Sequence, residues 1–253
     1  MREGSLGRLV LVVALACAAG ISAACGGGGG GVFKTQYEYE EELYLALDGT
    51  AAVNVNASVA ALDALRGFDL PVDPRARLDR ERVRALFQGP GVEVTRVSVS
   101  RRHSRRFVHV GIDVRDVRRL SQVAPFAWSK YRLERHGEVV QFRQTVGKAA
   151  GKSVGDVGWT GNEVVAFRLH IPSRIPFHNS PNDVQRGNIL MWEQPLSARL
   201  AGAPLDLEVD MEPRSILYST LLLFGGTVIA AALTFAVIIW WVIRRGRDAE
   251  VAA

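Results

Sequence analysis

The longest apolar run in the chain is Ile216–Ile243, and it contains no charged residue. A helix rises about 1.5 Å per residue, so about 20 residues cross the hydrocarbon core of a bilayer and this run can span it with some tilt. Tyr218 lies near the start of the run, and Trp240 and Trp241 lie near its end, where aromatic side chains favour the membrane interface. The pattern predicts one transmembrane helix within residues 215–243.

Three arginines, Arg244, Arg245 and Arg247, directly follow this run. Positive charges favour the cytoplasmic end of a membrane span. We therefore expect residues 244–253 to form a cytoplasmic tail and the preceding domain to be extracytoplasmic. The predicted location is the cell membrane, crossed once.

The N-terminal end has the layout of a secretory signal, with two early arginines, an apolar run and then small residues through Ala24. We expect residues 1–24 to be a signal peptide. Cys25 follows Ser-Ala-Ala and resembles the cysteine of a bacterial lipobox, which becomes lipid-modified. Ordinary cleavage or a retained anchor, with an unmodified cysteine, is the alternative. Six glycines follow, so residues 25–36 are predicted to be a lipid anchor and flexible tether.

Residues 37–214 alternate apolar and polar positions over short segments, which is typical of strands with one buried face. An Asp48-Gly49 turn predicts an early hairpin whose second strand is Ala51–Ser58. Valines from Val92 onwards predict a second hairpin with a bulge near Thr95. The clearest strand runs from Leu205 to Met211.

Short helices are predicted between the strands. Ser58 and Asp79 are good N-caps for helices over Val59–Leu65 and up to Phe87, and Gly67 and Gly89 follow them as stop signals. A further short helix is expected to open at Glu193. The predicted fold class is α+β, with a mostly antiparallel curved sheet, short covering helices and one C-terminal transmembrane helix.

The composition narrows the functional classes. About 180 residues remain between the two membrane-related ends, enough for one domain. The net charge is +5, and part of it comes from the termini, so nucleic acid is not an expected partner. Both cysteines, Cys17 and Cys25, lie in the first 25 residues, so the domain has no internal disulfide and no thiolate metal site.

No catalytic motif is evident. The five histidines show no H-x-x-x-H spacing, and no G-x-S-x-G sequence occurs. We expect no enzyme activity, no metal and no cofactor.

One charged cluster stands out in the second predicted hairpin. Its loop is expected at residues 101–106 and carries four arginines: Arg101, Arg102, Arg105 and Arg106. These are candidates for contact with acidic lipid headgroups, and the alternative is a solvated turn. A glycine-rich stretch, residues 147–161, is too long for a tight hairpin and is expected to be a functional loop.

The order of these features resembles the LppM family of mycobacterial envelope lipoproteins and the related bacterial domain. The features are a secretory start, a D-G hairpin, a helical insert, a middle β region, the Gly187-Asn188-Ile189-Leu190-Met191-Trp192 segment and a C-terminal span. The resemblance implies an α+β domain with an apolar cavity that binds envelope lipids or glycolipids.

We therefore expect a membrane-tethered envelope protein that binds lipid or glycolipid near the outer leaflet. Candidate cavity or rim residues are Phe126, Trp128, Trp159 and Trp192, although each could also be an ordinary core residue. The alternative function is a non-catalytic structural module that binds another envelope protein.

Overall fold

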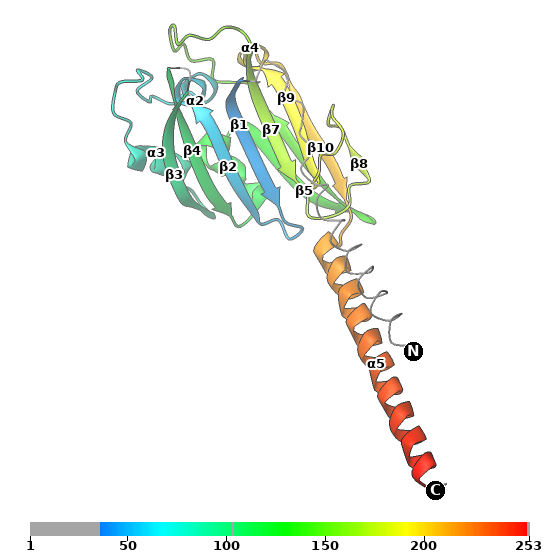
Figure 1. The fold of residues 1–253 in the computed structure, drawn as a ribbon. Coiled ribbons are helices and arrows are strands. Elements are labelled where there is room, and N and C mark those ends of the chain that lie inside the picture. The colour runs from blue at the N-terminus through cyan, green and yellow to red at the C-terminus, as the bar shows by residue number, and fades with distance from the viewer. Residues whose placement is uncertain (1–35, 103, 252–253) are drawn as a thin grey trace, which may run out of the picture. The chain divides into compact units, whose positions relative to one another are not determined.

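The structure, a computed structural model, describes residues 36–102 and 104–251. The predicted signal peptide, Cys25 and the glycine tether up to residue 35 lie outside the described residues. The described part is an α+β domain followed by one long helix, α5 (Ile216–Val251) (Figure 1). The predicted fold class is confirmed.

A six-stranded sheet is the centre of the domain, with the order β3-β4-β2-β1-β7-β9. Its strands are β1 (Gln36–Leu45), β2 (Ala51–Ser58), β3 (Val92–Arg102), β4 (Arg105–Val114), β7 (Glu163–His170) and β9 (Ile189–Pro195). Neighbouring strands are antiparallel except β1 and β7, which are parallel. The parallel pair joins segments more than 100 residues apart, so the hairpin pattern of the sequence does not indicate it.

A second sheet has four antiparallel strands in the order β5-β6-β10-β8. Its strands are β5 (Ser129–His136), β6 (Val139–Val146), β8 (Phe177–His178) and β10 (Leu205–Met211). The sequence predicted one curved sheet, whereas the strands divide into two. The last strand, β10, pairs with β6 and β8 of this sheet, whereas β9, which directly precedes it among the strands, pairs with β7 of the six-stranded sheet.

The helices are short and several have the predicted caps. They are α2 (Val59–Arg66), α3 (Arg80–Phe87), α4 (Leu196–Leu200) and the 3-10 helices η1 (Val117–Gln122) and η2 (Ala124–Phe126). The Ser58 hydroxyl accepts a hydrogen bond from the Ala61 amide, and Gly67 ends α2 at a φ of 74°. The short helix predicted before Gly202 is present as α4, but it starts at Leu196 rather than at Glu193, because β9 continues pairing with β7 as far as Pro195.

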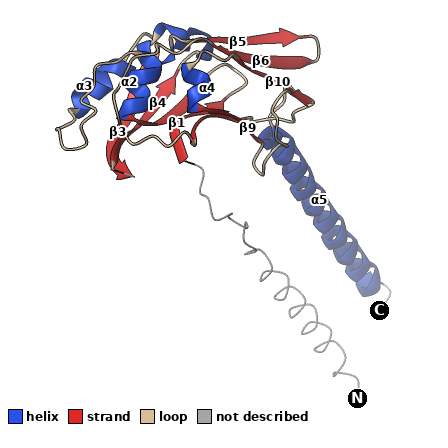
Figure 2. Ribbon diagram, turned by 90° about the horizontal axis from the view of Figure 1, so that it is seen from above, coloured by secondary structure: helices blue, strands red, loops and turns tan. Residues whose placement is uncertain are grey.

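The core lies on one side of the six-stranded sheet. Figure 2 shows the helices α2, α3 and α4 and the second sheet on that side. Alternate residues of β1, β2, β4 and β7 point into it and are buried, as the alternation in the sequence predicts. No helix of the described domain covers the opposite face, which we call the outer face.

The arginine-rich hairpin is tighter than predicted. Arg101 pairs with Arg106 and Arg102 pairs with Arg105, so all four belong to strands β3 and β4. Ser104 has a φ of 60°, a left-handed conformation suited to a tight turn. The six-residue loop prediction was therefore wrong, whereas the predicted bulge near Thr95 is confirmed by a register shift between Val94 and Arg96.

Helix α5 has the composition of a membrane span. Its segment Ile216–Trp241 has 26 residues and a mean hydropathy of 2.4, and none of its most apolar window is buried against the domain. Leu223, for example, is 73% exposed. Apolar surface in water costs about 25 cal/mol per Å², so a helix of this kind is stable only where another apolar medium covers it. Helix α5 is a candidate transmembrane helix.

Candidate functional site

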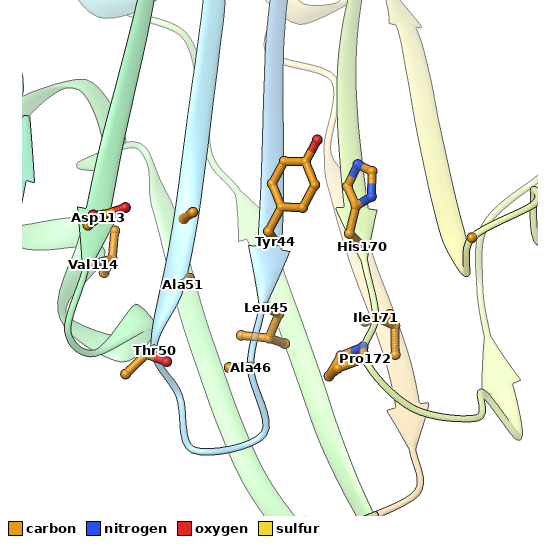
Figure 3. A pocket seen from close by; sticks show the side chains of 12 residues that line it. Tyr44, Leu45, Ala46, Thr50, Ala51, Asp113, Val114, His170, Ile171 and Pro172 are labelled. Carbon is orange, nitrogen blue, oxygen red and sulfur yellow. The ribbon is translucent and has the colours of Figure 1, made fainter. Parts of the chain in front are cut away.

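A groove of about 580 Å³ lies on the outer face, at the end of the sheet where β1 and β7 finish (Figure 3). Its lining comes from four strand ends and two loops. The lining residues are Tyr44, Leu45, Ala46, Thr50, Ala51, Ala52, Asp113, Val114, His170, Ile171, Pro172 and Gly187. Chain segments that are distant in sequence thus meet in one place.

The groove exists because a small residue lies between larger ones. Ala52 on β2 pairs with Tyr44 on β1 and with Asp113 on β4, and all three side chains are exposed on the outer face. The methyl group of Ala52 fills little of the space between the tyrosine ring and the carboxylate. Ala52 therefore forms the floor of the groove, between Tyr44 on one side and Asp113 on the other.

One wall of the groove is a stacked aromatic pair. The rings of Tyr44 and His170 are 3.9 Å apart at their centroids with an interplanar angle of 16°. Their strands are parallel neighbours, and the two residues pair directly. The Nε2 atom of His170 is 2.8 Å from Oε1 of Glu42, which holds the imidazole in place. Burial raises the pKa of the Tyr44 hydroxyl, and Glu42 acts in the same direction.

The hydrogen-bonded turn between β1 and β2 adjoins the groove and contributes Ala46 and Thr50 to its lining. The Asp48 carboxylate accepts hydrogen bonds from the Thr50 amide, at 2.9 Å, and from the Thr50 hydroxyl, at 2.7 Å. Gly49 has a φ of 91°, which favours glycine. The predicted D-G turn is thus confirmed, and it holds Thr50, a lining residue of the groove. Ring faces and acceptor oxygens lie side by side here, which suits a ligand with both apolar edges and hydroxyl groups.

The groove is joined directly to helix α5. The carbonyl of Pro172, a lining residue, accepts a hydrogen bond of 3.0 Å from the amide of Ile216, the first residue of α5. Ser173 and Ser215 also form an isolated bridge. This end of the sheet, which we call the α5 end, therefore lies beside the start of the candidate span.

The four predicted headgroup arginines lie at the other end of the sheet, which we call the far end. Strand β2 has eight residues between the two ends, a separation of about 25 Å. Arg105 and Arg106 are buried, while Arg101 and Arg102 are exposed. Burial therefore removes Arg105 and Arg106 from the predicted headgroup contact, and for the exposed Arg101 and Arg102 that contact stays a prediction.

The buried arginines have internal partners. Arg105 pairs with the buried Glu38 at 2.9 Å and donates to the Gly158 carbonyl at 2.8 Å. Arg106 donates to the carbonyls of Pro71, at 2.6 Å, and Asp73, at 2.8 Å. These guanidinium groups hold the glycine-rich loop and the loop before α3 against the sheet. A second pocket of about 660 Å³ lies between those loops.

The predicted cavity aromatics are packed core residues or loop supports. Phe126 is completely buried, and its ring contacts Phe87 at a centroid distance of 6.0 Å. Trp128 is 7% exposed and lies between two guanidinium groups, those of Arg66 at 4.8 Å and Arg199 at 5.0 Å from its ring. Neither ring lines the groove or the second pocket.

Trp159 and Trp192 use their indole N–H groups to hold loops. Trp159 donates to Glu38 at 3.3 Å, and Trp192, buried in β9, donates to Asn179 at 3.0 Å. The alternative of ordinary packing thus accounts for Phe126 and Trp128, and loop anchoring accounts for the other two. Sequence analysis missed Tyr44 and His170, because each occupies a polar strand position and only the parallel pairing brings them together.

A buried carboxylate links the two sheets. Glu41 of β1 is 1% exposed and accepts hydrogen bonds from the hydroxyls of Tyr131, at 2.9 Å, and Tyr39, at 3.0 Å, and from the Gln144 amide, at 2.9 Å. Burial raises the pKa of Glu41, and the three hydrogen bonds act in the opposite direction. Because all its partners are protein groups, we interpret it as a structural connection.

A polar chain crosses the outer face away from the groove. The Ser100 hydroxyl is 2.7 Å from Nε2 of His109, whose Nδ1 is 2.8 Å from Oδ1 of Asn56. Burial lowers the pKa of His109, and Arg102 and Arg96 act in the same direction. We interpret the chain as a network that stabilises strand pairing.

No group of three or more His, Cys, Asp or Glu side chains suited to a metal ion occurs among the described residues.

A scan against protein-family models gives no match, and a search of curated proteins gives none either. Among solved structures, the chain is similar to the NMR structure of the folded domain of LppM from Mycobacterium tuberculosis. The match covers 73% of this chain and 95% of that one, with 11% sequence identity and a TM-score of 0.40. At these values the similarity is a distant one in fold and supports no statement about a ligand.

Proposed function

We propose that this chain is a membrane-tethered extracytoplasmic protein of the cell envelope, and that its groove binds the polar head of a lipid or glycolipid. The observation that carries the proposal is the hydrogen bond between Pro172, in the groove wall, and Ile216, the first residue of α5. With α5 in the bilayer, the groove lies at the level of the headgroups. A headgroup can then enter it while its acyl chains stay in the membrane.

The chemistry of the groove supports this ligand class. The Tyr44–His170 stack offers a flat ring face, and Asp113 and Thr50 offer oxygen atoms for hydrogen bonds with hydroxyl groups. A volume of about 580 Å³ falls in the ordinary range of small-molecule sites. We propose a binding role without catalysis, and without a metal or cofactor.

The proposed site differs from the one expected from the sequence. That expectation placed the ligand in an apolar cavity lined by four aromatic residues, of which Phe126 and Trp128 are packed in the core. An open groove beside the membrane suits a headgroup, whereas an enclosed apolar cavity suits an acyl chain. The proposed ligand is still a lipid or glycolipid. The part of it that binds is the polar headgroup rather than the acyl chain.

The test uses the full chain in nanodiscs, incubated with lipids extracted from the envelope of the source cells, followed by mass spectrometry of the lipids that co-purify. We expect one lipid or glycolipid class to be enriched over empty nanodiscs. Replacing Ala52 with Leu fills the floor of the groove and should reduce that enrichment about tenfold or more. Ala52 is exposed, so the variant keeps its core.

The matched control is Thr145→Leu, which places the same side chain at an exposed strand position of the second sheet. This variant should retain the lipid. Equal enrichment for the two variants, or none for the unmodified chain, would contradict the groove proposal and favour the alternative, a module that binds another envelope protein.

The orientation has its own test. Protease added to intact cells should digest the domain and leave the C-terminal tail protected, because Arg244, Arg245 and Arg247 favour the cytoplasmic side. A tag placed after Ala253 reports on the tail. If the protease digests the tag and leaves the domain intact, the chain has the opposite orientation in the membrane.

A further inference from the structure

The loop between β7 and β9, residues 172–188, lies against the start of α5. Besides the Pro172 bond, the carbonyl of Arg174 accepts a hydrogen bond of 2.9 Å from the amide of Glu212. Strand β8, within the loop, pairs with the end of β10 through Phe177 and Asp210. The loop therefore follows the last residues of the domain up to the candidate span (Figure 1).

This loop carries exposed apolar side chains. Among the described residues before α5, the large hydrophobic side chains that are exposed are those of Tyr44 (40%), Phe177 (49%) and Val184 (38%). Two of the three lie on the loop, and Tyr44 lines the adjacent groove. Exposed apolar side chains gathered at one end of a domain mark a contact surface.

Three arginines lie near these side chains in the sequence or just before the start of α5. Arg174, Arg186 and Arg214 are exposed, and the side chain of Arg174 is 81% exposed. Residues 172–188 and 212–216 contain these three cations and two acidic residues, Asp183 and Glu212, which leaves a balance of +1. A guanidinium near an anionic bilayer surface contributes about 1 kcal/mol. Asp210, which pairs with Phe177, brings the local balance to zero, so the inference depends on the three exposed guanidinium groups together with the exposed apolar side chains.

The loop is held rigidly from inside. Oδ1 of Asn179 accepts hydrogen bonds from the Trp192 indole, at 3.0 Å, and from the Glu208 amide, at 2.9 Å. The Asn179 side chain also donates to the Asp206 carbonyl at 2.9 Å. Little conformational entropy remains to be lost when Phe177, two residues away, meets a surface.

We propose that residues 172–188 form a second membrane contact, in which Phe177 and Val184 enter the headgroup layer of an anionic bilayer and Arg174, Arg186 and Arg214 bind lipid phosphates. The inference rests on the membrane insertion of α5 proposed above, and it is independent of what the groove binds. The contact fixes the rotation of the domain on the membrane and keeps the groove facing the headgroups.

The test measures amide hydrogen exchange by mass spectrometry on the full chain, with one copy in each nanodisc. Discs of phosphatidylcholine are compared with discs that also contain phosphatidylglycerol. We expect amides of residues 172–188 to exchange several-fold more slowly in the anionic discs, with protection that weakens as salt is added. Amides of the far-end hairpin, residues 101–106, should be unaffected.

Two variants separate the contributions. Phe177→Ser with Val184→Ser should remove the protection in both kinds of disc, and charge reversal of Arg174, Arg186 and Arg214 to Glu should remove the part that depends on phosphatidylglycerol. The matched control reverses three exposed far-end arginines, Arg75, Arg77 and Arg101, and should keep the protection.

Equal exchange in both discs for the unmodified chain, or equal loss in the two charge-reversal variants, would overturn the proposal. The same measurement is repeated with two copies of the chain in each disc. Protection that occurs only in those discs would assign the loop to self-association and would also overturn the proposal. Co-elution of every variant with the nanodisc checks α5 insertion separately. Failure of the loop contact is thereby distinguished from failure of the span.

Discussion

The two ends of the six-stranded sheet use arginine in opposite ways. At the far end, Arg105 and Arg106 are buried and bind carboxylate and carbonyl oxygens of the protein. At the α5 end, Arg174, Arg186 and Arg214 are exposed, as are the apolar side chains of Phe177 and Val184. Two of the four arginines in the dense run are therefore internal supports, and the scattered arginines belong to the surface we propose for the membrane.

The physical reason lies in the loops that each end must hold. At the far end, the glycine-rich loop and the loop before α3 have no regular hydrogen bonding of their own, and the two guanidinium groups supply donors for their carbonyls. At the α5 end, the Asn179 side chain and backbone hydrogen bonds hold the loop of residues 172–188. The arginine side chains there remain at the surface.

The largest effect is expected for Arg105→Ala at the far end. The change leaves the buried Glu38 without its cation and two loop carbonyls without their donor. Removal of one partner of a buried ion pair costs about 3–5 kcal/mol. Urea unfolding of the full chain in mild detergent, followed by tryptophan fluorescence, measures the loss. A loss no greater than that of the exposed Arg101→Ala would mean that the far end is not held by this pair.

A pH-dependent effect is expected at Asp63, which is 2% exposed and accepts a hydrogen bond from the Leu70 amide at 3.1 Å. Burial raises the pKa of Asp63 from 3.8 to about 6. The folded chain thus keeps a proton that the unfolded chain releases, so the stabilisation is complete below about pH 4 and is lost as the pH rises through about 6.

Asp63→Asn keeps the acceptor and removes the titration. The difference in unfolding free energy between the unmodified chain and this variant should change by about 1–3 kcal/mol between pH 4 and pH 7, with the variant gaining at the higher pH. Asp69→Asn, at an exposed position nearby, should show no such trend. A difference that stays constant over this range would show that the carboxyl is not perturbed.

At the α5 end, His170→Ala should cost less stability, about 0.5–1 kcal/mol, because it removes one cross-strand stacking pair and one hydrogen bond. The same variant should also reduce lipid retention in nanodiscs, and this reduction should be larger than the small loss of stability would produce. Unfolding and lipid co-purification, measured on the same preparation, separate the two effects. A large loss of stability with unchanged lipid would make the stack a structural feature like those of the far end.

The smallest effect is expected for Arg174→Ala. Its ion pair with Glu212 is 3.7 Å long and exposed, and such pairs contribute little. The unfolding free energy in detergent should change by less than about 0.5 kcal/mol. A loss comparable with that of Arg105→Ala would remove the contrast between the two ends.

Local chemistry was sufficient to predict many elements of this fold. The Asp48-Gly49 turn, the Ser58 and Asp79 caps and the bulge near Thr95 depend on a few neighbouring residues, and all occur as predicted. Their energies come from short-range hydrogen bonds and backbone preferences, which the sequence displays directly. The apolar run that forms α5 belongs to the same class, because the length and composition of one segment define it.

The sequence by itself determined most of the elements, the candidate span and the α+β class, because each depends on residues close together in the chain. Only the tertiary structure decided which arginines are buried, that Ala52 lies between Tyr44 and Asp113, and that Tyr44 meets His170. Those facts depend on the parallel pairing of β1 with β7 and on the division into two sheets. Such pairings join segments far apart in sequence, and no local preference specifies them.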